Sequence, residues 1–299
     1  MSQGRADLHR HLDGSVRHST LTELAHAAGQ VVPEDLCFVP GMGLQAALSR
    51  FQFTLSLLQT PDAVARVAHE ICEDARREGV STLEIRFAPQ LHSGGSIPAI
   101  IDAALEGIAG RAGLIVCALY GDSPDLVDAL IDAAIPRPSV VGIDLAGGPS
   151  PRHRWGMRDL APCFQRAKDA GLGRTVHAGE GRPASEIHTA ITQLHAQRIG
   201  HGLSVLESPE VAALVRDTGV TIEACPTSNW HVGVIDSISD HPLPDWLSHD
   251  LKVCINTDNT LLSATDSVQE SLRAQQIPGV GTEGVQACHT HGHSARFQR

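Results

Sequence analysis

The stretch ADLHRHLDGS, residues 6–15, places His9 and His11 one residue apart close to the beginning of the sequence. In a β-strand, residues two apart point to the same face, so both imidazoles would project to one side. Two imidazoles on one face can bind the same metal ion. We therefore interpret this stretch as a strand that carries half of a metal site, and we ask whether the rest of the sequence supplies the other half.

Seven further short segments rich in apolar and β-branched residues follow this strand, and helical patterns lie between them. Strands that alternate with helices favour parallel βα units, and eight such units predict an α/β fold of the closed (β/α)8 type, a TIM barrel. The eight predicted strands span residues 6–9, 81–87, 114–120, 139–145, 174–178, 197–202, 220–226 and 251–257.

Residues 10–80 separate the first two predicted strands, which is too long a connection for one helix and a turn. Helices are predicted over 19–28, with Thr20 and Glu23 spaced as a capping box, and over 44–58. A third helix begins at Thr60-Pro61 and ends at Gly79. An insertion after a barrel strand lies on the face where barrel enzymes hold their active sites, so we predict a helical lid.

Residues 1–276 are predicted to form a single domain, and residues 277–299 a flexible tail, because helical periodicity is lost there. The tail contains CHTHGH, residues 288–293, which could chelate a metal. A polar terminal segment rich in glycine and histidine is more often unstructured, and we favour that interpretation.

Composition excludes several functional classes. The chain of 299 residues has 34 acidic and 23 basic residues, a net charge of −11 and no lysine- or arginine-rich run, so nucleic acid is not an expected partner. No apolar stretch approaches the roughly 20 residues that span a bilayer, and no membrane partner is expected. Seven scattered cysteines without a C-x-x-C pair indicate reduced thiols. We expect a cytoplasmic protein with a small-molecule substrate.

Candidate metal ligands fall at the ends of three predicted strands. His9 and His11 end the first strand, His177 the fifth, and Asp258 follows the eighth. The carboxyl ends of barrel strands converge on one face, so these four side chains can meet there. Three imidazoles and one carboxylate suit a catalytic zinc that keeps a position open for water. Taken singly, each could be a core histidine or, for Asp258, a helix cap.

Two further residues supply acid–base groups on the same rim. Glu180 lies three residues after His177, where a carboxyl group of raised pKa could protonate a substrate. His201, flanked by Gly200 and Gly202, could orient or deprotonate water. Glu180 could otherwise be a carboxylate at a helix start, and His201 a core histidine.

The sequence also argues against two other zinc architectures. Deaminases with an H-x-E motif need a P-C-x-x-C motif, which this chain lacks. Binuclear barrel hydrolases need a lysine at a strand end. The only lysines are Lys168, in a predicted helix, and Lys252, at the start of the eighth strand, so one zinc ion per chain is expected.

Seven motifs in this order resemble the adenosine deaminase family, a zinc-dependent branch of the amidohydrolase barrels: ADLHRHLDGSVR, LEIRFAPQ, VVGIDLAG, RTVHAGE, RIGHG, EACPTSN and INTDN. The resemblance covers residues 5 to 265. It implies that His9, His11, His177 and Asp258 bind zinc, that Glu180 donates a proton to the purine, and that His201 acts on the water. It also implies that His11 contacts the substrate, that Asp13 contacts the ribose, and that Gly147 and Asn259 contact the purine.

The resemblance implies attack of zinc-activated water on C6 of a 6-aminopurine, protonation of ring N1 by Glu180, and loss of ammonia, with Asp258 and His201 stabilising the reacting centre. Asp13 indicates a purine nucleoside, adenosine or 2′-deoxyadenosine. Adenine, aminodeoxyfutalosine, or a non-catalytic purine-binding role are the alternatives. The chain departs from the family at Asn259, where a second Asp is common, at Gly148-Pro149, and in its C-terminal segment.

Overall fold

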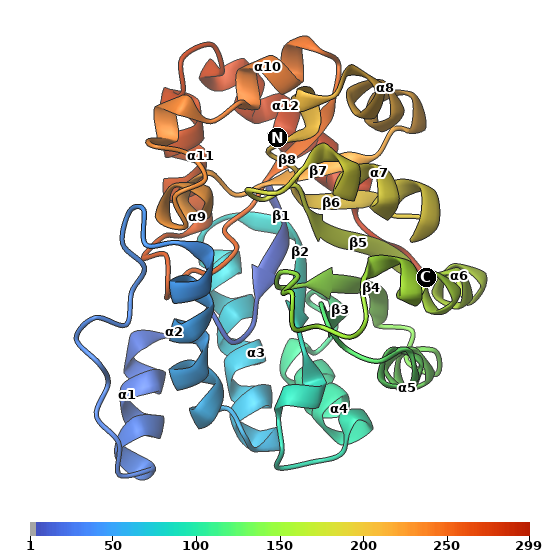
Figure 1. The fold of residues 1–299 in the computed structure, drawn as a ribbon. Helices are drawn as coiled ribbons and strands as arrows, with labels where there is room; N and C mark the ends of the chain where they lie inside the picture. The colour runs from blue at the N-terminus through green and yellow to red at the C-terminus, as the bar shows by residue number, and fades with distance from the viewer. Residues whose placement is uncertain (1–3) are drawn as a thin grey trace.

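The computed structural model describes residues 4–299 and contains eight parallel strands that pair in chain order around a barrel (Figure 1). The predicted (β/α)8 TIM barrel is confirmed, and each predicted strand corresponds to an observed one. The strands are β1 (Arg5–His11), β2 (Val80–Phe87), β3 (Gly113–Leu119), β4 (Val140–Ala146), β5 (Gly173–Ala178), β6 (Arg198–His201), β7 (Thr221–Ala224) and β8 (Lys252–Ile255).

The segment after β8 brings the two ends of the sheet together. The backbone N–H of His11 donates to the carbonyl of Asp258 at 2.8 Å, and the N–H of Asp258 donates to the carbonyl of His9 at 2.8 Å. These two bonds form a short parallel bridge beside β1. The bridge places Asp258 next to the H-x-H pair, although His11 and Asp258 lie near opposite ends of the sequence, so only closure of the barrel brings them together.

Twelve α-helices and four short 3-10 helices connect and cover the strands within residues 4–299. None of the helices in this range is both long and apolar enough to cross a membrane. The α-helices are α1 (His18–Ala27), α2 (Leu44–Leu57), α3 (Pro61–Arg77), α4 (Ile97–Ile108), α5 (Pro124–Ala134), α6 (Ala161–Asp169), α7 (Ala184–Gln193), α8 (Pro209–Thr218), α9 (Pro226–His231), α10 (Leu243–Ser248), α11 (Ser267–Gln276) and α12 (Gly281–Ala295). The 3-10 helices are η1 (Pro89–Leu91), η2 (Met157–Leu160), η3 (Val205–Glu207) and η4 (Ile238–Asp240).

The predicted helices of the long first connection are present, but one predicted cap is wrong. Thr60 caps α3 as expected, since its hydroxyl accepts from the N–H of Ala63 at 3.3 Å. Thr20 does not cap α1, which begins after Arg17. Its hydroxyl instead donates to the carboxylate of Glu70 at 2.6 Å and joins α1 to α3. A buried tertiary partner therefore replaces the local capping interaction that the spacing predicts.

Helix α2 lies at the mouth of the barrel, where the inserted segment was expected (Figure 1). Leu48 and Phe51 on this helix line two cavities that reach His11 of β1. Movement of α2 as a lid stays a prediction.

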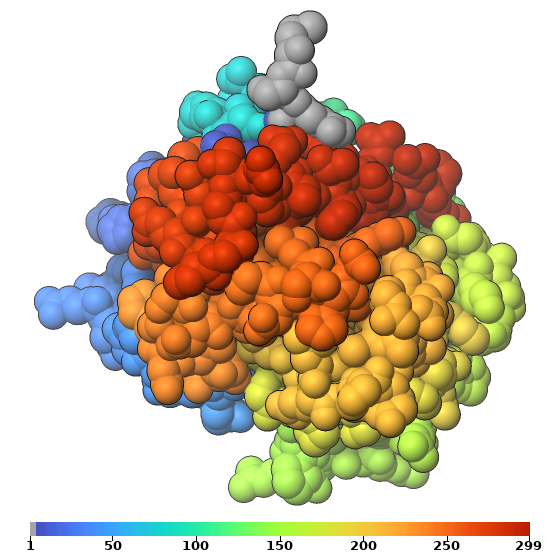
Figure 2. All heavy atoms as spheres, turned by 90° about the horizontal axis from the view of Figure 1, so that it is seen from above, coloured from blue at the N-terminus to red at the C-terminus, as the bar shows by residue number. Residues whose placement is uncertain are grey.

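The prediction of a flexible tail over 277–299 is wrong. Residues Gly281–Ala295 form α12, which buries Val285 and Cys288 against the rest of the protein. Figure 2 shows this C-terminal segment, in red, as a continuous band across the face seen from above. Burial of these apolar side chains stabilises a helix whose own composition is unfavourable. We propose that the single domain extends through α12 and does not end at residue 276.

The CHTHGH motif binds the backbone of the barrel. His289 Nδ1 lies 3.4 Å from the backbone nitrogen of Ala6, and His291 Nδ1 lies 3.2 Å from the backbone nitrogen of Val253. His293 Nε2 lies 2.6 Å from the carbonyl oxygen of Gly4. The three rings thus contact polar groups at the starts of β1 and β8. This role explains the histidines without a metal.

Candidate active site

The four predicted metal ligands converge at the carboxyl end of the barrel. His11 Nε2 lies 3.2 Å from His9 Nε2 and 3.3 Å from His177 Nε2. Asp258 Oδ1 lies 3.5 Å from His11 Nε2 and 3.7 Å from His9 Nε2. Strands β1 and β5 and the segment after β8 therefore present three nitrogens and one oxygen to a single point.

These spacings fit a single metal ion shared by the four side chains. Ligands about 2.0–2.2 Å from a zinc ion lie roughly 3–3.6 Å from one another. The separations from Nε2 of His11 to the other three donor atoms, and from His9 to Asp258, are 3.2–3.7 Å. The donor set of imidazole and carboxylate, without thiolate, is one that zinc and other divalent transition metals accept. The residues present therefore fit a metal cofactor.

A second layer of side chains orients two of the imidazoles. His9 Nδ1 donates to Glu223 on β7 at 2.7 Å, and His177 Nδ1 donates to Asp144 on β4 at 3.1 Å. Because a carboxylate can only accept, each ring carries its proton on Nδ1 and leaves the lone pair of Nε2 free. Arg86 on β2 donates to both carboxylates, at 3.0 Å to Asp144 and 2.9 Å to Glu223.

Burial favours the neutral form of the H-x-H pair. Loss of solvent holds the pKa of both His9 and His11 well below the usual value, and the charge of Arg86 acts in the same direction. For His177, burial lowers the pKa, but the adjacent Asp144 carboxylate outweighs that effect and the pKa is raised. Neutral imidazole is the form that binds a metal.

Glu180 and His201 lie beside the donor atoms, and Asn229 connects them. Oε1 of Glu180 is 3.5 Å from Nδ1 of His201. The side-chain amide nitrogen of Asn229, on α9, donates to Nδ1 of His201 at 3.0 Å and lies 3.5 Å from Oε1 of Glu180. Burial raises the pKa of Glu180 and lowers that of His201 to about 3. The structure thus brings together a carboxyl group of raised pKa and a neutral imidazole.

Backbone conformation at two of these residues is unusual. His201 has φ of 65° and Asp258 has φ of 60°, in the left-handed region that residues with a side chain rarely adopt. Such conformations cost of order 1–3 kcal/mol and concentrate at functional sites. The surrounding hydrogen bonds hold both side chains toward the donor cluster in spite of this cost.

The predicted substrate-binding residues surround a cavity next to the donor atoms. Asp13, Gly147 and His11 line a cavity of about 830 Å³, and Asn259 lines a smaller one of about 60 Å³ that also contacts His11 and Gly147. Gly147 has φ of 77°, a conformation that glycine adopts without strain. Because glycine has no side chain, its backbone is accessible from the cavity that it lines. Oδ1 of Asp13 and Oδ1 of Asn259 are buried, and neither has a hydrogen-bond partner within residues 4–299.

Sequence reasoning did not identify Asp144, Glu223, Arg86 or Asn229. The first three lie inside the barrel on β4, β7 and β2, and the last lies on α9 just after β7. Buried charged residues inside predicted strands are the signal that could have found the first three, because such groups are rarely buried without a partner.

Comparisons with known proteins agree with this geometry. A profile of the family described as "Adenosine deaminase" matches residues 4–298. A curated adenosine deaminase from Vibrio atlanticus is 34% identical, covering 93% of this chain and 89% of that protein. The crystal structure of an adenine deaminase from Arthrobacter aurescens is 25% identical with a TM-score of 0.89, covering 100% and 95% of the two chains.

A third similar protein is Arabidopsis ADAL, whose crystal structure contains IMP. It is 25% identical to this chain with a TM-score of 0.86, and the similarity covers 99% of this chain and 93% of that one. Two findings support one family assignment: the sequence similarity extends over nearly the whole chain, and the expected ligands converge. This chain belongs to the adenosine deaminase family.

Proposed function

We propose that this protein is a zinc-dependent aminohydrolase that converts adenosine and 2′-deoxyadenosine to inosine and 2′-deoxyinosine, with release of ammonia. The observation that carries the proposal is the convergence of four donor atoms, from His9, His11, His177 and Asp258. Nε2 of His11 lies 3.2–3.5 Å from the other three donor atoms, and Oδ1 of Asp258 lies 3.7 Å from Nε2 of His9. One zinc ion per chain is proposed. When bound, such an ion lowers the pKa of water toward neutrality and so provides a nucleophile.

Glu180 is proposed as the proton donor to the purine. Burial raises its pKa, so the carboxyl group keeps its proton at a higher pH than an exposed glutamate does. Protonation of ring N1 makes C6 more electrophilic, so that water adds to C6 and the bond to the amino group can break. Ammonia then leaves, and the purine retains oxygen at C6.

His201 and Asp258 are proposed to orient the attacking water. The bond from Asn229 to Nδ1 of His201 favours the tautomer with its proton on Nε2, which leaves Nε2–H as a donor. Asp258 supplies a carboxylate oxygen on the same side, and Asn259 donates to that oxygen at 2.7 Å. Fixed groups of this kind stabilise developing charge without having to reorganise.

Asp13, His11, Gly147 and Asn259 are proposed to bind the nucleoside. The buried, unpartnered Oδ1 atoms of Asp13 and Asn259 support this assignment, because a buried acceptor without a donor is costly unless a ligand supplies one. A ribose hydroxyl can donate to Asp13. The amide of Asn259 can pair with the purine ring, because its Oδ1 is free to accept from a ligand donor or a water.

A second candidate substrate is a 6-aminopurine with a substituent on the ribose. The cavity of about 830 Å³ extends beyond Asp13 to Arg152 and His153, two basic side chains at its exposed edge. The IMP complex of ADAL shows that a similar fold accepts a purine nucleotide. Adenine and aminodeoxyfutalosine remain alternatives for the same reaction. The cytoplasmic location expected from the composition stays part of the proposal.

The test is a substrate panel followed by ultraviolet absorbance. Zinc-supplemented protein is mixed separately with adenosine, 2′-deoxyadenosine, adenine and AMP. Conversion of the two nucleosides with little change in adenine supports the proposal and the role of Asp13. Faster conversion of AMP would favour the second candidate. No conversion of any compound by zinc-loaded protein would overturn the proposed substrates.

A further inference from the structure

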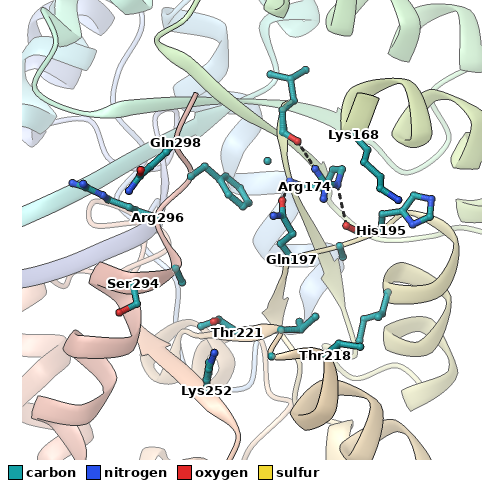
Figure 3. Close-up of a pocket in the computed structure, with 18 of the residues that line it drawn as sticks. Lys168, Arg174, His195, Gln197, Thr218, Thr221, Lys252, Ser294, Arg296 and Gln298 are labelled. Carbon is teal, nitrogen blue, oxygen red and sulfur yellow. Dashed lines mark hydrogen bonds between the residues drawn. The ribbon is translucent and has the colours of Figure 1, made fainter. Parts of the chain in front are cut away.

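A second large cavity lies at the opposite end of the barrel from the candidate active site. It has a volume of about 850 Å³ and is lined by residues at the starts of β5, β7 and β8, among them Arg174, Thr221 and Lys252. The C-terminal segment, including Arg296, forms another wall. Figure 3 shows Lys168 and His195 on one side of this cavity, and Arg296 and Gln298 on the other.

The cavity is strongly basic in an acidic protein. Lys168, Arg174, Lys252 and Arg296 line it, and these include the only two lysines of the chain. No aspartate or glutamate is among its lining residues in the described part of the chain. The whole chain has a net charge of −11, so a cavity with four cations and no carboxylate differs sharply from the average surface.

Arg174 is the fixed element of this cavity. Its side chain is only 8% exposed, and its Nε donates to the carbonyl of His195 at 2.9 Å while Nη1 donates to the carbonyl of Leu172 at 2.5 Å. Those two bonds orient the guanidinium but do not neutralise it. Within residues 4–299, Arg174 has no carboxylate in ion-pair contact.

Other buried arginines of the barrel have carboxylate partners, unlike Arg174. Arg86 pairs with Asp144 and Glu223, and Arg198 pairs with Glu84 and Glu223. A buried cation without a counter-charge is costly, which makes an anionic ligand a natural partner for Arg174. Burial, acting alone, lowers the pKa of Arg174, in agreement with this lack of compensation.

We propose that this cavity binds a small polyanion that carries three or more negative charges, of the triphosphate type. Four cations and a volume of about 850 Å³ exceed what a single phosphate group requires. The side-chain amide nitrogen of Gln197, also in the lining, offers an uncharged donor beside the cations. The ligand could be inorganic tripolyphosphate or the triphosphate of a nucleotide, which share this chemistry. The inference does not depend on the proposed deaminase activity.

Calorimetric titration of the full-length, zinc-loaded protein tests the proposal. Tripolyphosphate, ATP and inorganic phosphate are titrated at low salt, with inosine present to occupy the active site. We expect tripolyphosphate to bind at least tenfold more tightly than phosphate. Equal affinities for tripolyphosphate and ATP would show that the phosphates are the recognised group. Tighter binding of ATP would show that the cavity also contacts the nucleoside.

The double variant Lys168→Gln/Lys252→Gln should weaken tripolyphosphate binding by tenfold or more, because it removes two of the four positive charges. Both lysine side chains are exposed, so neither substitution removes a packed group and the fold should be retained. Arg216→Gln on α8, an exposed basic residue outside the cavity, is the matched control. Three outcomes would overturn the proposal: tripolyphosphate does not bind at all, it binds no more tightly than phosphate, or the double variant binds it as tightly as the unmodified protein. Should the double variant unfold, the two single variants are measured in its place.

Chemical labelling gives an independent measurement. Because the chain has only two lysines, an amine-reactive acylating reagent can modify just Lys168, Lys252 and the terminal amine. Tripolyphosphate should slow modification of both lysines several-fold and leave the terminal amine unchanged. Equal slowing at all three amines, or none, would contradict a ligand bound in this cavity.

Discussion

His9 on β1 and Glu223 on β7 meet inside the barrel, with Nδ1 of His9 2.7 Å from Oε2 of Glu223 and both side chains fully buried. The carboxylate fixes the proton of the imidazole on Nδ1, so that Nε2 faces the other proposed metal ligands. Glu223 also accepts from Arg86 and Thr175. One carboxylate therefore links an imidazole of the proposed metal site to the charged interior of the barrel.

Glu223→Gln should weaken metal retention and turnover by about 10–100-fold, the usual effect of losing a carboxylate that supports a metal-bound histidine. The amide is nearly the same size but carries no charge to balance Arg86. Metal content after dialysis against a competing chelator, and turnover at saturating zinc, measure the two effects. Glu106→Gln, an exposed change on α4, is the control. Normal metal retention in Glu223→Gln would contradict the assigned role.

Glu180→Gln should lower turnover by about two orders of magnitude or more, because the amide cannot donate the proton that the carboxyl group holds. Zinc content should not change, since the donor atoms come from other residues. Steady-state kinetics and metal analysis of the same preparation separate these outcomes. The control is Glu207→Gln, a change at an exposed residue of η3, which should leave turnover and zinc content as in the unmodified protein. Unchanged turnover in Glu180→Gln would remove Glu180 from the mechanism.

Gly14→Ala should disturb Asn259 directly. A Cβ at residue 14 would lie 1.9 Å from Oδ1 of Asn259, whose amide donates to Asp258 at 2.7 Å. The side chain of Asn259 has to move, and we expect at least a tenfold loss in kcat/KM together with a stability cost of about 1–3 kcal/mol.

The matched control is Gly156→Ala, where φ is −112° and the nearest atom to a new Cβ is 3.8 Å away. Kinetics and thermal unfolding of both variants are compared. Adding Asn259→Ser to Gly14→Ala should recover stability by removing the clash, while activity stays low. Full activity of Gly14→Ala alone would show that the position of Asn259 is unimportant.

The barrel and the convergence of the proposed metal ligands could be predicted because both follow from periodic patterns. Short β-branched segments mark the strands, and a residue at a strand end reaches the active face whatever the rest of the chain does. This reasoning identified His177 and Asp258 correctly as neighbours of His9 and His11, which the donor distances confirm.

Asp144 and Glu223 could not be assigned in the same way. Each lies within a predicted strand, where a charged residue indicates a buried partner, but only the three-dimensional structure identifies those partners as Arg86 and a histidine. Helix α12 was missed for another reason. Gly281, Gly284 and Gly292 disfavour a helix in isolation, and packing against β1 and β8 stabilises it.

His289 should make the stability of the protein depend on pH. Its Nε2 lies 3.1 Å from Oγ of Ser271, whose hydroxyl donates to the carbonyl of Ser267, so Nε2 is the donor and Nδ1 accepts from Ala6. A proton on Nδ1 would face the N–H of Ala6. Burial lowers the pKa of His289 to about 4, below the value near 6.5 of an unfolded histidine.

Because the folded pKa is the lower one, the stabilising contribution of neutral His289 is complete above about pH 6.5 and is lost as the pH falls toward 4. At pH 5 the loss approaches about 2 kcal/mol. Urea unfolding at pH 7.5 and pH 5.0 should show that His289→Gln loses less stability on acidification than the unmodified protein by up to this amount. His26→Gln, on the exposed side of α1, should lose as much as the unmodified protein. Equal losses in all three proteins would show that α12 remains docked when His289 is protonated.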